Sequence, residues 1–437
     1  MPSLQEGAST TSSSISLIKT IIGAGMLSMP LAYSTDGIIF GTFIILLAAA
    51  TSGFGLFLQA YTAAYVPKGN ASFFNLCCIT YPLLSVLFDI AIAIQCFGCA
   101  ISYLVLVGDI MTKIVKDVPF IPESSYKIFW TLSSAVLCVP LSFMKNLDSL
   151  RYTSILGLIA IGYVLMLTVG HFIAGDIQRD DKSKLALFPP NATGVFSTIS
   201  IIVLAFTGHQ NMFSIINEAK DKTLISLTKL IVLAIAVSSG LFIIVGLSGY
   251  LTFGDHVNAN IVLLYPNSFT ATLGRLAIIF MVIFSFPLML HPARISVNNI
   301  VFWCRTQLQR KLYQEPERAP LTQESDIEQN NEHHQKVAYV IPLSERSFNV
   351  ITISLLFLGY FLAITVKSFA FILAIVGATG STSISFTLPG LFGYKLIGSE
   401  LTELSTLEST FKYLSLFLVI WGLVVMMTCL YASLFLS

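Results

Sequence analysis

The chain has 437 residues, of which 55% are hydrophobic and 11% are charged, and its formal net charge is +1. Soluble domains carry about 25% charged residues, so this composition excludes an ordinary soluble domain. A net charge this small also gives no reason to expect a nucleic-acid partner. We therefore interpret the chain as a protein embedded in a lipid bilayer.

Apolar runs of about 20 residues recur along the chain, and each is long enough to cross about 30 Å of hydrocarbon. They predict an all-α polytopic membrane protein with eleven transmembrane helices, preceded by a short N-terminal segment, 1–11. The predicted spans are 12–34, 37–65, 82–112, 126–144, 149–174, 193–216, 226–252, 269–291, 347–366, 368–394 and 412–435. Only Lys367 and Ser368 mark the division between the ninth and the tenth.

The loops predict the orientation of the chain. Lys and Arg are more numerous in the loops that share a side with the N-terminus, so we expect the N-terminus on the cytosolic side and the C-terminus on the other. The longest loop, 305–346, is polar and acidic around 323–332. Such a segment buries too little apolar surface to fold, so we expect a disordered cytosolic loop that contains no enzyme domain.

The first span is interrupted by Gly23, Gly25 and Pro30. In hydrocarbon, a broken helix persists only where protein or a cavity covers its free backbone groups. Secondary transporters place their substrate between such half-helices. The break therefore predicts a ligand site built from backbone groups.

The sixth span, five spans further on, is also unusual, because Thr207, Gly208, His209 and Gln210 lie in its middle. Two interrupted spans at corresponding places in two five-helix halves indicate an inverted-repeat transporter. The alternative is that small residues only let the helices pack closely. The serines and threonines of 379–387 have the same two interpretations.

Three motifs carry a family resemblance. The run 20–30 resembles the first-helix signature of the amino acid/auxin permease family, and 205–210 followed by Asn217 and Glu218 is similar to its aromatic–x–x–His pattern and trailing Glu. The run 376–391 resembles the helix-10 motif. The likeness covers nearly the whole chain outside 305–346, and it is nearest to the fungal vacuolar amino acid transporters.

The resemblance implies the fold of the bacterial leucine transporter, which is a 5+5 inverted repeat with one extra helix. The first repeat would be 12–174, the second 193–394 with the 305–346 loop inside it, and the extra helix 412–435. It also implies amino acid export from the vacuole by alternating access. In the orientation expected from the loop charges, the N-terminus is then cytosolic and the C-terminus lumenal. Without the resemblance, the direction of transport is open, because an alternating-access carrier runs down the combined gradients of amino acid and coupling ion.

Two other function classes were compared with transport. A membrane amino acid sensor on the same scaffold would share the site and is not separated from a transporter by sequence. An intramembrane enzyme would need clustered acid, base or metal-ligand side chains, whereas the six histidines show no metal-ligand spacing. We therefore expect no enzyme activity, metal or cofactor, and we expect an amino acid as the ligand.

A free amino acid is a zwitterion, and paired broken helices suit one. N–H groups that start the second half of the first span can hold a carboxylate, and carbonyls that end the first half of the sixth can accept from an ammonium. Glycine lets the backbone approach the ligand closely. The predicted substrate-binding residues are Gly23, Ala24, Gly25, Met26, Phe206, Thr207, Gly208 and His209. For His209, a gating or substrate role and a packing role both stay open.

Lys19 lies one turn before Gly23, on a polar stripe with Ser12 and Ser16. In sodium-coupled relatives within the resembled family, an asparagine at this place helps to hold sodium. We expect the Lys19 ammonium to stand there and to couple transport to protons, with Ser285 as a partner. The alternative is that Lys19 reaches back to the interface.

Two further charged residues have predicted roles. Glu218 follows the sixth span and could close a cytosolic gate with Lys19 or Lys222. Arg275, in the outer part of the eighth span, is expected to reach the interface or to pair with Asp36 or Asp109.

Overall fold

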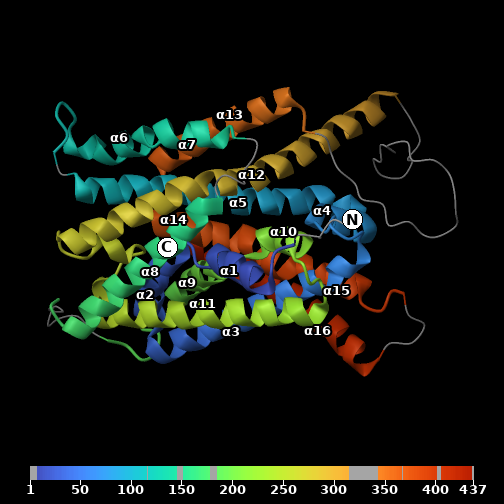
Figure 1. Ribbon diagram of the computed structural model, residues 1–437, viewed down its shortest axis with the longest axis horizontal. Helices are drawn as coiled ribbons and strands as arrows, with labels where there is room; N and C mark the ends of the chain where they lie inside the picture. The colour runs from blue at the N-terminus through green and yellow to red at the C-terminus, as the bar shows by residue number, and fades with distance from the viewer. Residues whose placement is uncertain are drawn as a thin grey trace, which may run out of the picture.

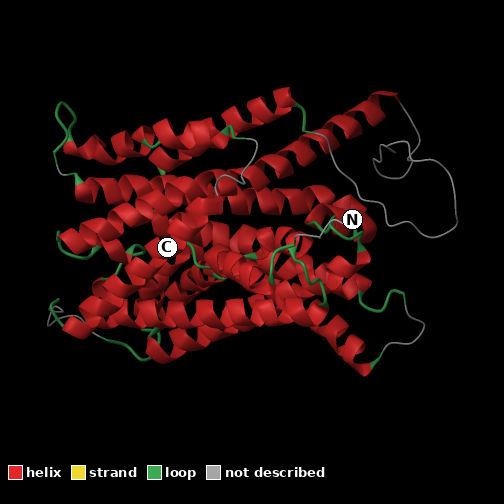
Figure 2. Ribbon diagram, in the orientation of Figure 1, coloured by secondary structure: helices red, strands yellow, loops and turns green. Residues whose placement is uncertain are grey.

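The computed structural model describes residues 7–115, 117–144, 151–177, 185–313, 343–366, 368–400 and 405–435. Within these ranges every regular element is helical, and the one pairing of strand type is an isolated parallel bridge between Ala8 and Ala219. Figure 2 shows helices throughout, with short loops at both ends of the bundle. The predicted all-α class is confirmed.

The long helices run roughly side by side (Figure 1). In chain order the α-helices, long and short, are α1 (Thr10–Ile21), α2 (Met29–Asp36), α3 (Ile38–Thr62), α4 (Phe73–Thr80), α5 (Ser85–Ile114), α6 (Tyr126–Ser133), α7 (Ala135–Ser142), α8 (Arg151–Ala174), α9 (Ala192–Ala205), α10 (His209–Glu218), α11 (Leu224–Phe253), α12 (Phe269–Tyr313), α13 (Glu345–Thr365), α14 (Phe369–Val376), α15 (Leu388–Leu396) and α16 (Thr406–Phe435). A 3-10 turn, η1 (Ala24–Ser28), joins α1 to α2, and two π-helical turns, Gly377–Ser381 and Ser383–Thr387, join α14 to α15.

In the described part of the chain, nine helices are long and apolar enough to cross a membrane, and ten if the bent pair α1 and η1–α2 counts as one span. Large apolar side chains point outward from them; Phe357 on α13 is 76% exposed and Met427 on α16 is 65% exposed. Such an exterior suits lipid rather than water. The chain is therefore a multi-pass membrane protein.

The fourth predicted span, 126–144, consists of two eight-residue helices, α6 and α7, on either side of Ser134. Pro140 lies inside α7 and supplies no backbone N–H to that helix. This segment accounts for the difference between ten spans and the eleven that were predicted. The count of eleven stays a prediction.

One further boundary agrees with the sequence-based spans and two differ. α13 and α14 are separate helices, as predicted for the ninth and tenth spans. α12 continues to Tyr313, where the sequence predicted a loop from residue 305, and residues 314–342 lie outside the described part. α4 is an additional short helix between the second and third spans.

The first described residues lie at one end of the bundle, where Ala8 pairs with Ala219 just past α10, and the last helix, α16, ends toward the opposite end. The second position follows from packing: α16 runs antiparallel to α15, so that Gly393 lies against Ser415 and Gly422 lies against Thr387. We refer below to the N-terminal end, near α4, and to the far end.

Candidate functional site

The first span breaks at Ile22 and Gly23. α1 ends at Ile21, and Gly23 is extended with φ −108° and ψ −152°. The two parts of the span are bent by 46°. The N–H groups of Ala24 and Gly25 come before the first hydrogen bond of η1, which Met26 donates to the Gly23 carbonyl at 3.2 Å. They are therefore the free donors of the second half of the span.

Pro30 does not cause this break. It occupies the first turn of α2, where proline is well tolerated because that turn needs no N–H. Pro30 therefore restarts the helix after the extended residue. The backbone of Gly23 interrupts it.

The sixth span breaks between Ala205 and His209. Thr207 satisfies two acceptors of the last turn of α9: its N–H bonds to the Leu204 carbonyl at 3.0 Å, and its Oγ1 donates to the Val203 carbonyl at 2.8 Å. The Ala205 and Phe206 carbonyls follow at the C-terminal end of α9, where the helix itself supplies no donors. The negative end of the α9 dipole therefore lies at this break.

The two breaks lie against each other at the middle of the bundle. A Cβ added to Gly25 would lie 2.8 Å from the Cβ of Ala205. A Cβ added to Gly208 would lie 2.9 Å from Ile21 and 3.0 Å from Leu17. Glycine is needed at both places because the backbones approach so closely.

The breaks divide the two spans into two pairs of half-helices. At the N-terminal end α1 packs against α10, through Leu17, Ile21 and Gly208. At the far end α2 packs against α9, where a Cβ on Gly194 would lie 2.7 Å from Thr35. The predicted pairing of a broken first and sixth span is thus present in the structure.

The predicted substrate residues differ in accessibility. Ala24, Met26, Phe206, Thr207, Gly208 and His209 are buried. Gly23 and Gly25 keep partial exposure, as does Tyr103 on α5. The Tyr103 hydroxyl oxygen lies 3.8 Å from the position of a Cβ on Gly23. Gly23, Gly25 and Tyr103 are therefore the partly exposed residues among those considered at this break.

His209 has both ring nitrogens engaged. Nε2 lies 3.1 Å from the Ser52 carbonyl on α3, and Nδ1 lies 3.0 Å from Ser385 Oγ in the π-helical turn. The Gln59 amide also donates to the His209 carbonyl, at 3.2 Å. In this conformation His209 links three spans, which supports the packing interpretation of this residue.

The helix-10 hydroxyls are engaged in the same way. Ser381 Oγ donates to Gln95 Oε1 on α5 at 2.6 Å, and Ser385 reaches His209. π-helical turns in otherwise α-helical spans often occur at functional sites. Here they direct two serines toward different neighbouring spans.

Lys19 extends toward α8 rather than into the break. Its Cε lies 3.7 Å from the position of a Cβ on Gly157, and Met281 Cγ on α12 lies 3.6 Å from the same position. Ser285 is half-buried one turn after Met281. Lys19 and Ser285 therefore belong to helices that meet at Gly157 of α8.

Glu218 takes part in a backbone contact at the N-terminal end. Its side chain is exposed, and its carbonyl accepts from the Ala8 N–H at 2.9 Å, while the Lys220 N–H donates to the Ala8 carbonyl at 2.9 Å. Lys222 donates instead to the Asn217 carbonyl at 2.7 Å. The Glu218 carboxylate is thus not paired with Lys222 in this conformation.

Arg275 does not form either of the two ion pairs suggested for it. Its guanidinium donates to the carbonyls of Val262 and Tyr265 and to Asn267 Oδ1, with distances of 3.3, 2.6 and 2.7 Å. Asp109 pairs with Lys127 at 2.7 Å. The pairing expectation is wrong, because main-chain carbonyls of the preceding loop surround the guanidinium.

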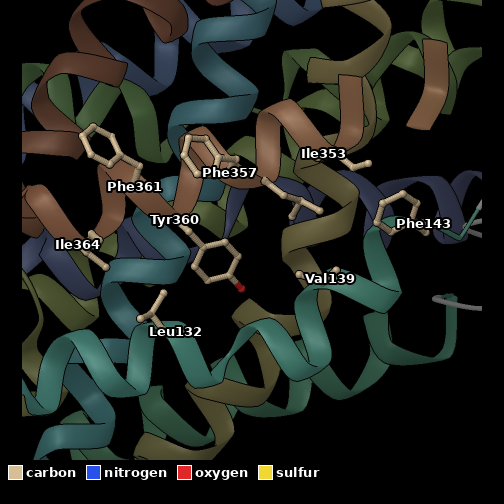
Figure 3. Close-up of a pocket in the computed structure, with 9 residues that line it drawn as sticks. Leu132, Val139, Phe143, Ile353, Phe357, Tyr360, Phe361 and Ile364 are labelled. Carbon is tan, nitrogen blue, oxygen red and sulfur yellow. The ribbon is translucent and has the colours of Figure 1, made fainter. Parts of the chain in front are cut away.

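Two cavities lie away from the breaks. One, of about 450 Å³, lies between α6–α7 and α13; its walls are Leu, Ile, Val and Phe side chains with Tyr360 (Figure 3). The Tyr360 hydroxyl is already bonded to Ser134 Oγ at 3.1 Å. The other, of about 480 Å³, lies at the N-terminal end, between the end of α3 and the start of α11. The apolar cavity offers no group that would hold a zwitterion, unlike the breaks.

Comparisons with known proteins point to one family. Residues 6–433 match the family model described as "Transmembrane amino acid transporter protein". Vacuolar amino acid transporter 6 of Saccharomyces cerevisiae is 41% identical, over 98% of this chain and 99% of the relative. Vacuolar amino acid transporter 5 of the same yeast is 40% identical over 97% of each. Sodium-coupled neutral amino acid transporter 7 of Danio rerio is 24% identical over 68% of this chain and 66% of the relative.

Proposed function

Because the chain belongs to the transmembrane amino acid transporter family, we propose that it carries amino acids across the vacuolar membrane. Relatives named as vacuolar amino acid transporters support both the substrate class and the membrane, since the match extends over nearly all of each chain. The observation that carries the proposal is the contact between two broken spans at Gly25 and Ala205.

In our proposal the breaks bind the two charged ends of the amino acid. The N–H groups of Ala24 and Gly25 receive the carboxylate, because they are free donors at the positive end of a helix. The Ala205 and Phe206 carbonyls receive the ammonium. Tyr103, whose hydroxyl lies near Gly23, is placed to add a donor to the carboxylate.

We further propose eleven spans in a 5+5 inverted repeat plus one helix, working by alternating access. Support comes from the break in the first span and the break five spans later, and from the division of these spans into two pairs of half-helices. Separation of α2 from α9 would open the far end, and separation of α1 from α10 would open the N-terminal end. Glu218 would contribute to the second gate through its carbonyl, which bonds to Ala8.

The proposed coupling ion is the proton, and Lys19 is its proposed carrier. The support is that Lys19 occupies the sequence position where sodium-coupled members of the resembled family have an asparagine that helps to hold sodium, and that Ser285 lies on α12, which meets Lys19 at Gly157. With the N-terminus cytosolic, the far end faces an acidic lumen. Protons that move with substrate down this gradient would drive export to the cytosol.

Radiolabelled amino acid flux in proteoliposomes tests the proposal. Vesicles with a neutral interior and an acidic exterior should accumulate label from a mixture of L-amino acids, and dissipation of the pH gradient by a protonophore should abolish the accumulation. A sensor would show ligand-dependent thermal stabilisation without flux. Absence of both flux and stabilisation with every amino acid in the mixture would overturn the proposal.

A further inference from the structure

A carboxyl group is buried at the far end of the bundle, in the contact between two half-helices. Asp36 is the last residue of α2 and has no exposed surface. Thr198 Oγ1 on α9 donates to Asp36 Oδ1 at 2.6 Å. Asp36 Oδ2 is buried and has no hydrogen-bond partner.

The chain that follows α2 closes over this carboxyl. Gly37 has φ 76°, a conformation that favours glycine, and a Cβ there would lie 2.6 Å from Leu187 and Phe188 backbone atoms. The Ile38 N–H donates to the Ala186 carbonyl at 3.0 Å. Water is therefore kept from the end of α2.

The elements packed against α2 are α3, α9, α11, η1 and the turn Gly254–His256. The titratable groups of these elements at the far end are Tyr250, Asp255 and His256, and α2 itself carries Tyr33.

Each of these groups has another partner. The Tyr33 hydroxyl is bonded to Thr42 Oγ1 at 2.9 Å, and the Tyr250 hydroxyl accepts from the Ala186 N–H at 2.8 Å. Asp255 and His256 are exposed and lie beside each other. Arg275 is directed to the loop at 262–267. Over the described residues, no cation pairs with Asp36.

An ionised carboxylate with one hydrogen bond and no cation is strongly disfavoured in such surroundings, whereas a neutral carboxyl is tolerated. We propose that Asp36 is a proton-binding site, and that α2 closes onto α9 with the Asp36 carboxyl protonated. The site is distinct from Lys19, which lies on α1 on the opposite side of the break.

This inference rests on the alternating access of the proposed function. When the far end opens, α2 and α9 separate and water reaches Asp36, so that the carboxyl ionises. Closing then takes up one proton from the compartment at that end. The closed form should therefore lose population as the pH of that compartment rises, by at most about tenfold per pH unit.

A cysteine reporter tests the inference without any transport measurement. Thr35 adjoins Asp36, is half-buried and packs against Gly194 of α9, so a Thr35→Cys thiol becomes more accessible when α2 and α9 separate. The experiment uses full-length protein in liposomes, with Cys304→Ser to remove the exposed native cysteine and a membrane-impermeant maleimide as the label. Labelling rates are compared with and without Asp36→Asn, at about pH 5 and about pH 8.

The ratio of the two rates cancels the pH dependence of the maleimide reaction itself. We expect labelling with Asp36 present to be close to that of the Asp36→Asn protein at the acidic pH and several-fold faster at the alkaline pH. Asp109→Asn is the matched control, because that carboxyl lies at the same end and is ion-paired with Lys127; it should leave the pH response of the reporter unchanged. A ratio that does not change with pH would overturn the inference.

Thr198→Val provides a second, independent variant. The Thr198 hydroxyl favours the ionised carboxyl, so its removal should move the rise in labelling to higher pH. If Asp36→Asn does not fold, Thr198→Val alone decides the question. A rise in labelling at higher pH than in the protein with Thr198 supports the site, and an unchanged pH of the rise rejects it. The labelling rate reports the separation of α2 from α9 and needs no amino acid flux. The Asp36 site and the proposed transport function can therefore be rejected independently of each other.

Discussion

Gly23 and Gly25 lie two residues apart in the first break, yet their surroundings impose different demands. A Cβ on Gly25 would collide with Ala205, whereas a Cβ on Gly23 would meet only the Tyr103 hydroxyl, at 3.8 Å. Gly23 has a negative φ that any residue can adopt. Close backbone packing therefore explains Gly25, while Gly23 is left to be explained by the approach of a ligand.

We expect Gly25→Ala to destabilise the protein by about 1–3 kcal/mol, because it overpacks the contact between the breaks. Gly23→Ala should melt at the wild-type temperature and lose most of its amino acid flux. Thermal melting in detergent and flux in proteoliposomes measure the two effects. Gly240→Ala is the control, since nothing lies within 4 Å of the added Cβ. Wild-type flux in Gly23→Ala would contradict the proposed site.

Replacement of Lys19 separates proton coupling from substrate movement. Lys19→Met keeps the length of the side chain that reaches Gly157 and removes the ammonium. It should retain exchange of labelled for unlabelled amino acid while losing acceleration by a pH step. Lys229→Met, on the exposed face of α11, should behave as wild type. An unchanged response of Lys19→Met to the pH step would dismiss Lys19 as the coupling residue.

Among the elements, α10 is joined at the N-terminal end to the loop before α4. Asn217 holds the loop before α4 through both of its amide atoms: Oδ1 accepts from the Ala71 N–H at 3.0 Å, and Nδ2 donates to the Ala71 carbonyl at 2.8 Å. A side chain thus pairs with a backbone as a neighbouring strand would. This loop follows α10 in any movement of that helix that keeps the pair intact.

Asn217→Ala should free this loop. The loss of two hydrogen bonds, at about 1 kcal/mol each, should speed hydrogen–deuterium exchange of the Ala71 amide without a global loss of structure. Asn217→Asp keeps the acceptor and loses the donor, so it should give an intermediate rate. Equal exchange rates in all three proteins would show that the pair does not restrain the loop.

Sequence reasoning located both breaks because their cause is local. The backbone of Gly23 and the polar residues 207–209 interrupt apolar runs, and each is visible within one span. It suggested the wrong ion-pair partners for Arg275 and overlooked the contact between Asp36 and Thr198, because those contacts depend on tertiary packing. The division of the fourth span at Ser134 was also missed, since its composition is as apolar as that of its neighbours.

For the whole molecule, the start of α1 and the end of α16 lie toward opposite ends of the bundle (Figure 1). We expect an N-terminal tag and a C-terminal tag to lie on opposite faces of the vacuolar membrane. Protease protection in sealed vacuoles measures this, with cleavage of the N-terminal tag from outside and survival of the C-terminal one. Loss of both tags from intact vacuoles would contradict the predicted orientation.

The parallel pairing of Ala8 with Ala219 has a mechanical consequence. It fastens the chain ahead of α1 to the chain just past α10, so the two half-helices at this end move as one body while the pairing lasts. Its two main-chain hydrogen bonds contribute about 1 kcal/mol each, which thermal motion overcomes readily. Because both hydrogen bonds use main-chain atoms, they depend on the presence of residue 8 and not on its side chain. A deletion that removes residue 8 would therefore release α1 from α10 at this end, whereas a substitution of Ala8 would keep the pairing.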